Sequence, residues 1–137
     1  MNMNKLLFAF FGFAFTSCIV NNTYSFKASL MPVLGVITSG IGQMDASSQD
    51  NNARLSVNGS YSTLTSPPTS IIVSSPTRTC IMDIYPDTVA SGRFAGICEG
   101  PATNDDINNV NNGLTKVLIK TTSYPNGELS GVIQRLN

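Results

Sequence analysis

The sequence predicts an all-β protein, built as an antiparallel Greek-key β-sandwich or barrel of about seven or eight short strands. Two observations support this prediction. Polar and apolar residues alternate through most of the chain after residue 26, whereas no segment keeps a helical apolar period over three turns. Only 12% of the residues are charged, and the many serine, threonine and asparagine residues suit an extracellular β module better than a cytosolic helical enzyme.

The alternation is clearest at 54–61, where Leu55, Val57 and Tyr61 share one face and polar side chains occupy the other. The pair Asn58-Gly59 could form a hairpin turn instead, but the alternation keeps its phase across it and favours one continuous strand. Strands of this length are typical of superoxide-dismutase-like or immunoglobulin-like folds. The other predicted strands are 26–34, 36–44, 70–74, 78–85, 93–99, 114–122 and 128–136.

Turn-forming residues separate these strands. They include Asp50-Asn51-Asn52, Ser66-Pro67-Pro68, Ser75-Pro76, Pro86-Asp87 and Tyr124-Pro125-Asn126-Gly127. The last of these is the strongest signal, because Pro125 sets φ at the first corner and Asn-Gly tolerates positive φ after it. We therefore expect the last two strands to form an antiparallel hairpin.

The segment 104–113 departs from the strand pattern and predicts a short helical turn that Gly113 ends. Oxygen atoms of Asp105, Asp106, Asn108 and Asn109 could offer ligands to Ca²⁺, but their spacing does not match an EF-hand loop. We therefore expect a polar connector here.

The first 25 residues are predicted to be a secretory signal peptide, which leaves 26–137 as the mature β domain. Lys5 supplies the positive charge, and the apolar run 6–15 is shorter than the roughly 20 residues of a membrane span. Small residues allow cleavage after Cys18 or after Ser25. Alternatively, the residues ending at Cys18 form a bacterial lipobox and Cys18 carries a lipid. No second hydrophobic span follows, so none is expected in the mature chain.

Cys80 and Cys98 remain once the leader is set aside. An even pair in an exported chain predicts one disulfide, between adjacent strands or their flanking loop. Closing a loop of this size would stabilise the fold by about 3 kcal/mol. Two buried free thiols are the alternative.

The composition argues against several classes of function. Acidic and basic residues balance at eight each, which disfavours a nucleic-acid partner held by a basic face. The chain contains no histidine, so Ser-His-Asp and Cys-His nucleophile systems and imidazole metal sites have no basis in it. We predict no catalytic residue, no metal ligand and no cofactor.

The C-terminal residues 113–121 and 124–133 resemble the end of the chordin-type (CHRD) domain, which carries a P-x-G turn followed by G-E-I-R-G-Q-I. Pro125, Gly127, Glu128 and Gly131 match this motif. The resemblance extends more loosely over 26–136 and implies an extracellular antiparallel β domain in which these four residues specify the fold.

Three departures from the chordin-type pattern bear on function. The mid-domain histidines of many members have no counterpart at 70–74, the histidine of the penultimate strand is replaced by Lys120, and the arginine of the final motif is replaced by Ser130. Any site that those histidines form in relatives is therefore missing from this chain.

These observations together predict a secreted, non-catalytic module that binds an extracellular protein or glycan, or that forms part of a surface layer. An edge strand or the Asn-rich segment would be the natural contact. A lipid-anchored envelope or virion-surface component is the alternative, and a hydrolase with two carboxylates is a third possibility. In a eukaryotic host, Asn58 would lie in an N-glycosylation sequon.

Overall fold

The computed structural model describes residues 23–49, 54–99 and 104–136. The predicted leader, the cleavage and lipidation positions and the turn at Asp50-Asn51-Asn52 lie outside the described residues. The strands are β1 (Thr23–Pro32), β2 (Ile41–Gln49), β3 (Leu55–Ser62), β4 (Pro68–Ser75), β5 (Arg78–Ile81), β6 (Asp83–Pro86), β7 (Gly92–Cys98), β8 (Lys116–Thr121), β9 (Leu129–Val132) and β10 (Gln134–Arg135). The helix α1 (Asn104–Asn111) lies between β7 and β8.

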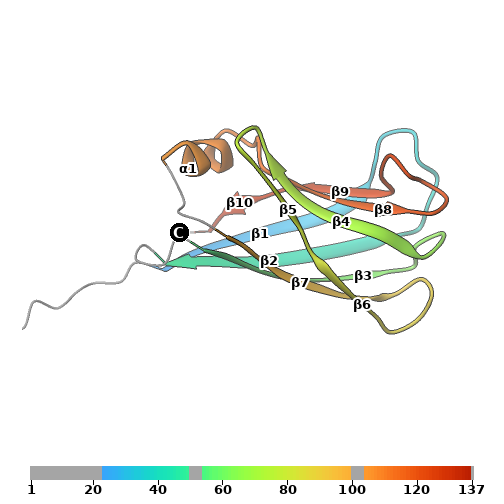
Figure 1. Ribbon diagram of the computed structural model, residues 1–137. Helices are drawn as coiled ribbons and strands as arrows, with labels where there is room; N and C mark the ends of the chain where they lie inside the picture. The colour runs from blue at the N-terminus through green and yellow to red at the C-terminus, as the bar shows by residue number, and fades with distance from the viewer. Residues whose placement is uncertain (1–22, 50–53, 100–103, 137) are drawn as a thin grey trace, which may run out of the picture.

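The strands form one nearly closed antiparallel sheet with the order β5-β4-β8-β9-β1-β2-β3-β7-β6, and β10 pairs with the start of β1. Figure 1 shows the resulting barrel-like shape. The helix α1 and the last described residues lie at one end, called the helix end below. The loops 33–40 and 122–128 lie at the opposite end, called the loop end. The prediction of an antiparallel all-β fold is confirmed.

The two edges of this sheet are consecutive in the chain. Met82 separates β5, which pairs with β4, from β6, which pairs with β7. The backbone N–H of Met82 still donates to the carbonyl of Ile71 in β4, at 2.9 Å, and the chain then turns to its new partner. The barrel therefore closes through a single stretch of chain that changes partner at one buried residue.

Two predicted strands are divided in the structure. The stretch 78–85 becomes β5 and β6, and the stretch 128–136 becomes β9 and β10. The dividing residues, Met82 and Ile133, are buried hydrophobic residues, so the side-chain alternation continues while the pairing partner changes. This explains why the structure has ten strands where the pattern predicted about eight.

The predicted strand at 36–44 is placed wrongly. The strand β2 begins at Ile41, and 33–40 is a loop that turns at Gly35, where φ is +85°. The N–H of Val36 donates to the carbonyl of Val33 around this turn, and Leu34 and Ile37 are almost fully exposed, so the apolar residues here do not pack as an inward-facing strand. By contrast, β3 runs unbroken through Asn58 and Gly59, as the alternation predicted.

The buried core fills the inside of the barrel between its two ends. Its largest fully buried apolar side chains are Phe94, Leu30, Met44, Ile71, Ile119, Leu129 and Ile133. They come from strands all around the barrel, as expected where alternate residues of each strand point inward. The core leaves space at the helix end of the barrel.

Candidate functional site

An apolar pocket of about 130 Å³ lies at the helix end of the barrel. Phe26, Leu55 and Val73 line it from three strands, and Ile107 and Val110 line it from α1. These two helix residues are three positions apart and therefore share one face of the helix. The helix α1 thus covers the pocket as a roof, and the barrel wall forms its floor.

The roof helix has a well-defined end. The N–H of Leu114 donates to the carbonyl of Asn109, and the N–H of Gly113 donates to the carbonyl of Val110. With Gly113 at φ +69°, this is the Schellman arrangement that commonly ends a helix. The prediction that Gly113 ends a helical turn is confirmed, and the turn is a helix of eight residues.

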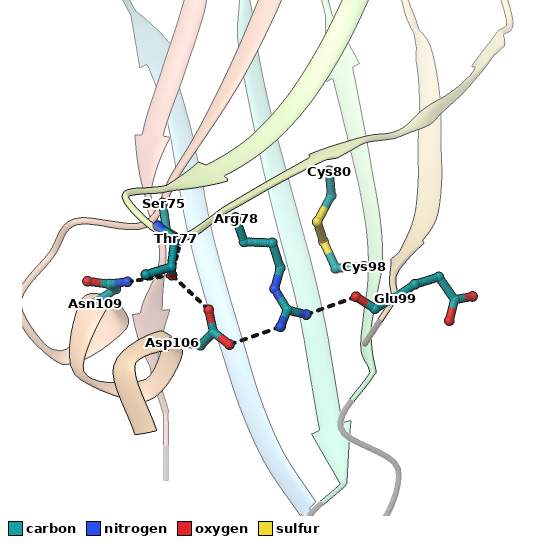
Figure 2. Close-up of polar contacts among 8 residues, drawn as sticks. All are labelled: Ser75, Thr77, Arg78, Cys80, Cys98, Glu99, Asp106 and Asn109. Atoms are coloured by element: carbon teal, nitrogen blue, oxygen red, sulfur yellow. Dashed lines mark hydrogen bonds and ion pairs between the residues drawn. A yellow bond between two sulfur atoms is a disulfide. The ribbon is translucent and has the colours of Figure 1, made fainter. Parts of the chain in front are cut away.

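Polar side chains tie the roof to the barrel (Figure 2). The Arg78 guanidinium lies 3.1 Å from Oδ2 of Asp106, and the Thr77 hydroxyl donates to Oδ1 of the same carboxylate at 3.0 Å. The side-chain amide of Asn109 donates to the Thr77 hydroxyl, also at 3.0 Å. We call these four residues the latch. Asp106 and Asn109, two of the four residues considered as Ca²⁺ ligands, therefore hold the helix in place.

The disulfide between Cys80 and Cys98 forms part of the pocket wall. Cys80 lies on β5 and Cys98 lies on β7, and the Cα atoms of the two residues are 5.5 Å apart. These two strands are not hydrogen-bonded neighbours. Arg78 spans the same gap, because its Nη1 donates to the carbonyl of Glu99 at 3.1 Å (Figure 2). The predicted disulfide is confirmed, but it crosses the seam where the barrel closes and does not join adjacent strands.

One buried polar atom of the pocket has no partner in the described part of the chain. Thr115 is only 7% exposed, and it lines the pocket just before β8. Its Oγ1 makes no hydrogen bond with any described residue. A buried hydroxyl without a partner costs about 1–3 kcal/mol. This oxygen has almost no accessible surface, so it is unsatisfied within the packed wall of the pocket.

The rim of the pocket is polar and charged. Arg78, Asp106 and Arg135 border it, and the Arg135 guanidinium stacks over the ring of Tyr24 at 4.3 Å. An apolar interior with a polar rim is the usual form of a small-molecule site at the mouth of a β-barrel. The arrangement can hold a small, mainly apolar molecule.

The loop end holds a different polar cluster, centred on Glu128, which has no exposed surface. Its Oε1 accepts hydrogen bonds from the Thr38 hydroxyl at 2.6 Å and from the Thr65 backbone N–H at 2.8 Å and hydroxyl at 3.0 Å. Its Oε2 accepts from the Thr121 hydroxyl at 2.8 Å. Burial acts to raise the pKa of Glu128, but these hydrogen bonds outweigh it, and the pKa lies below its usual value.

The other residues that carry the chordin-type resemblance flank Glu128 in the chain. Pro125 and Gly127 belong to a turn in which the N–H of Gly127 donates to the carbonyl of Tyr124, and Gly127 has φ +127°. Gly131 lies on β9, where a side chain would overlap the carbonyl of Ser29 on β1. The expected hairpin is present, since β8 pairs antiparallel with β9. The sequence could not show that Glu128 is buried and bound by three threonines.

The structure keeps the remaining sequence-derived candidates apart from the pocket. Asn58 lies exposed on β3, and its glycosylation stays a prediction.

Among residues 23–49, 54–99 and 104–136, no three His, Cys, Asp or Glu side chains gather as a metal site would require. No helix in those ranges is long and apolar enough to cross a bilayer. The sequence analysis missed the pocket and Thr115, because neither leaves a motif.

Comparison with known proteins adds no relative. No protein-family profile, no curated protein sequence and no solved structure matches the chain significantly.

Proposed function

We propose that this chain is an exported, non-catalytic binding module that holds a small, mainly apolar ligand in the pocket beneath α1. The observation that carries the proposal is the pocket itself, which is apolar inside, polar at its rim and roofed by a helix that the latch holds. Sites of this form at barrel mouths bind ligands by burying most of their surface. Binding by apolar burial needs no reacting group in the protein.

The absence of catalysis is proposed on two grounds. The chain has no histidine to act as a general base near neutral pH. Glu128, the one fully buried carboxylate among the described residues, already accepts hydrogen bonds from three threonines and has no exposed surface for a substrate to approach. A side chain held in this way supports the fold in preference to proton transfer.

Export is proposed from the leader-like start of the chain, where Lys5 precedes the apolar run 6–15, and from the Cys80–Cys98 disulfide, since such bonds persist in oxidising compartments. The chordin-type resemblance of the C-terminal residues supports the same location. A lipid anchor at Cys18 remains the alternative mode of export. The intact mass of the N-terminal fragment distinguishes the two, because a lipid adduct on Cys18 supports the anchor and an unmodified start after Cys18 excludes it.

A glycan partner is the second candidate function, and an open polar depression of about 430 Å³ favours it. Gln43, Asp87 and Arg93 line this depression beside the hydroxyl of Tyr61, which has no hydrogen-bond partner among the described residues. Burial, and then the charge of Asp87, raise the pKa of that hydroxyl. Planar amide, carboxylate and guanidinium groups offer paired hydrogen bonds to sugar hydroxyls.

The test compares two tryptophan variants of the exported protein. Val110→Trp fills the pocket from the roof, whereas Ile97→Trp adds the same side chain at a position that is 51% exposed and outside the pocket. Binding of a panel of small apolar molecules, followed by amide chemical shifts, should be lost in the first variant and kept in the second. Ligand shifts unaffected by Val110→Trp, or turnover of any panel member, would overturn the proposal.

The glycan candidate has a separate readout. A glycan array probed with the same protein should show binding that Arg93→Ala and Gln43→Ala remove and Val110→Trp leaves unchanged. An array without bound glycans rejects this candidate and leaves the pocket proposal standing on its own test.

A further inference from the structure

We infer that the loop 33–40, at the loop end of the barrel (Figure 1), docks the protein onto a phospholipid bilayer by placing its apolar tip at the boundary between headgroups and acyl chains. This inference goes beyond the proposed ligand pocket and does not depend on it, because the pocket lies at the helix end. Three features of the loop carry it: the exposure of its apolar side chains, the lack of charge around them and the hydrogen bonds that hold the loop in shape.

The tip of the loop exposes large aliphatic side chains. Leu34 is 101% exposed and Ile37 is 90% exposed, the two highest values among the exposed large hydrophobic residues of the described chain. A Cβ atom added to Gly35, between them, would meet nothing within 4 Å, so the tip stands in open space. Single exposed apolar residues are ordinary on a protein surface, whereas two large ones, almost wholly exposed on one loop, indicate a contact surface.

The surroundings of the tip carry no charge. No Asp, Glu, Lys or Arg occurs between residues 28 and 44, a stretch that includes the whole loop, and the neighbouring loop segment 122–127 is uncharged as well. The carboxylate of Glu128 behind the loop is fully buried and bound by three threonines. Moving an ionised group into the apolar part of a bilayer is costly, so a loop without one can enter at little electrostatic cost.

Hydrogen bonds hold the loop in this shape and pair several of its backbone groups. The N–H of Val33 donates to the carbonyl of Glu128, and the N–H of Val36 donates to the carbonyl of Val33, both at 2.9 Å. The Tyr124 hydroxyl donates to the carbonyl of Ile37 at 3.0 Å. Backbone groups that are already paired cost less to bring into lipid. A loop fixed before binding also loses little conformational freedom when it binds.

A bilayer fits this tip better than a protein partner does. Stable protein interfaces bury about 800 Å² on each partner and use roughly 20–30 residues a side, whereas the apolar surface here belongs to one short loop. A bilayer accepts a few inserted side chains without a matching shape. Tyr124, at the base of the loop, is of a residue type enriched at membrane interfaces. Insertion of Leu34 and Ile37 should give weak, reversible binding, at most comparable with that of a single acyl chain.

The experiment measures how the exported protein, Leu34→Ser and Ile37→Ser partition onto vesicles of pure phosphatidylcholine, by co-sedimentation at several lipid concentrations. Each substitution should lower the partition coefficient about tenfold, because it removes a large apolar side chain from the lipid. Leu34→Phe should retain binding, since it keeps an apolar side chain at the tip. Ile81→Ser is the matched control, because Ile81 is 74% exposed but lies on β5, and it should leave the partition coefficient unchanged.

Two further measurements separate insertion from adsorption through charge. Because the loop is uncharged, vesicles of equal parts phosphatidylcholine and phosphatidylserine should bind the protein about as well as phosphatidylcholine alone. A nitroxide label on the lipid, placed just below the headgroup, should broaden the amide signals of Leu34 and Ile37 and spare that of Ile81.

Partition coefficients that Leu34→Ser and Ile37→Ser both leave unchanged would overturn the inference and assign membrane binding to another part of the chain, such as a lipid on Cys18. Binding to the phosphatidylserine vesicles alone would overturn it as well, because such adsorption depends on charge. Absence of binding to either kind of vesicle would also overturn it, and self-association that Leu34→Ser abolishes would then assign the tip to contact between copies of the chain. None of these results bears on the pocket, which Val110→Trp tests separately.

Discussion

The side-chain hydroxyl of Thr38 lies 2.6 Å from Oε1 of Glu128, although 90 residues separate the two in the chain. The same carboxylate binds Thr65, which follows β3, and Thr121, at the end of β8. One buried anion therefore joins three separate parts of the chain at the loop end of the barrel. Glu128 acts there as a structural centre, and its consequences for stability are measurable.

Replacing Glu128 by alanine should destabilise the fold by on the order of 3 kcal/mol, because four hydrogen bonds to a buried charged acceptor lose their partner together. The measurement is urea denaturation at neutral pH. Glu99→Ala is the control, because its side chain is 69% exposed and it should change the free energy of unfolding by less than about 0.5 kcal/mol. Equal effects of the two substitutions would contradict the role assigned to Glu128.

The lowered pKa of Glu128 predicts a specific pH dependence. Since the pKa in the folded protein lies below that in the unfolded chain, the carboxylate contributes its full stabilisation above the unfolded value, about 4.3, and loses it as the pH falls through the folded value. Glu128→Gln does not titrate at this position. The difference in unfolding free energy between the unaltered protein and Glu128→Gln should therefore be constant near neutrality and decline at acidic pH. A difference that grows on acidification would show that the sign is wrong.

The disulfide across the seam should contribute about 3 kcal/mol to stability, as expected for a closed loop of this size. We expect the double substitution Cys80→Ala and Cys98→Ala to lower the free energy of unfolding by that amount in a denaturant titration. The unaltered protein under reducing conditions should match the double variant, and the variant should not respond to the reductant. A titration curve that the reductant leaves unmoved would argue against any structural role for the bond.

The latch should control how often the roof helix opens. Arg78 and Asp106 are 26% and 18% exposed, so their ion pair should be worth more than a surface pair, about 1–2 kcal/mol by double-mutant cycle with Arg78→Met and Asp106→Asn. Hydrogen exchange of the α1 amides should accelerate in each variant. Arg54→Met is the matched control, because its ion pair with Glu99 is 54% and 69% exposed and lies outside the latch. Exchange in α1 that responds equally to Arg54→Met would contradict the latch.

The start of β1 bears on where the proposed leader would be cleaved. Thr23, Tyr24 and Ser25 all pair with β2, and the carbonyl of Ser25 accepts a hydrogen bond from the N–H of Leu136 at 2.8 Å. Cleavage after Ser25 would delete these contacts together with a side chain that lines the pocket. We therefore expect N-terminal sequencing of the exported protein to find a start upstream of Thr23, as cleavage after Cys18 or lipidation of Cys18 would give. A start at Phe26 would contradict this.

The sequence predicts the local features of this fold well and the closure of the barrel poorly. Alternation, the turn at Tyr124–Gly127 and the end of the helix at Gly113 depend on neighbouring residues, so a single sequence displays them. The change of partner at Met82 depends on which strand lies alongside, and side-chain alternation is the same before and after it. For this reason the pattern could indicate a disulfide but not that it spans two unpaired strands.

The candidate site could hardly be predicted from the sequence, because it too depends on which strands lie side by side. The pocket arises because the residues that face it come from several strands and from α1, and each of them looks like an ordinary core residue in the sequence. Thr115 is one of many threonines, and only the packing around it shows that its hydroxyl is buried without a partner. The residues that carry the chordin-type resemblance were visible, yet Pro125, Gly127 and Glu128 lie at the opposite end of the barrel, and Gly131 pairs with Val117 on β8.

The first strand and the last short strand run side by side, with Phe26 opposite Arg135, at the end of the barrel where α1 lies (Figure 1). An affinity tag, a bead or a lipid attached before β1 or after β10 would therefore lie near the pocket beneath α1 and obstruct access to it. Attachment at the loop end, for example near Leu34, whose side chain is fully exposed, would instead leave the pocket accessible to solvent. Orientation on a support should therefore decide how much ligand an immobilised sample captures.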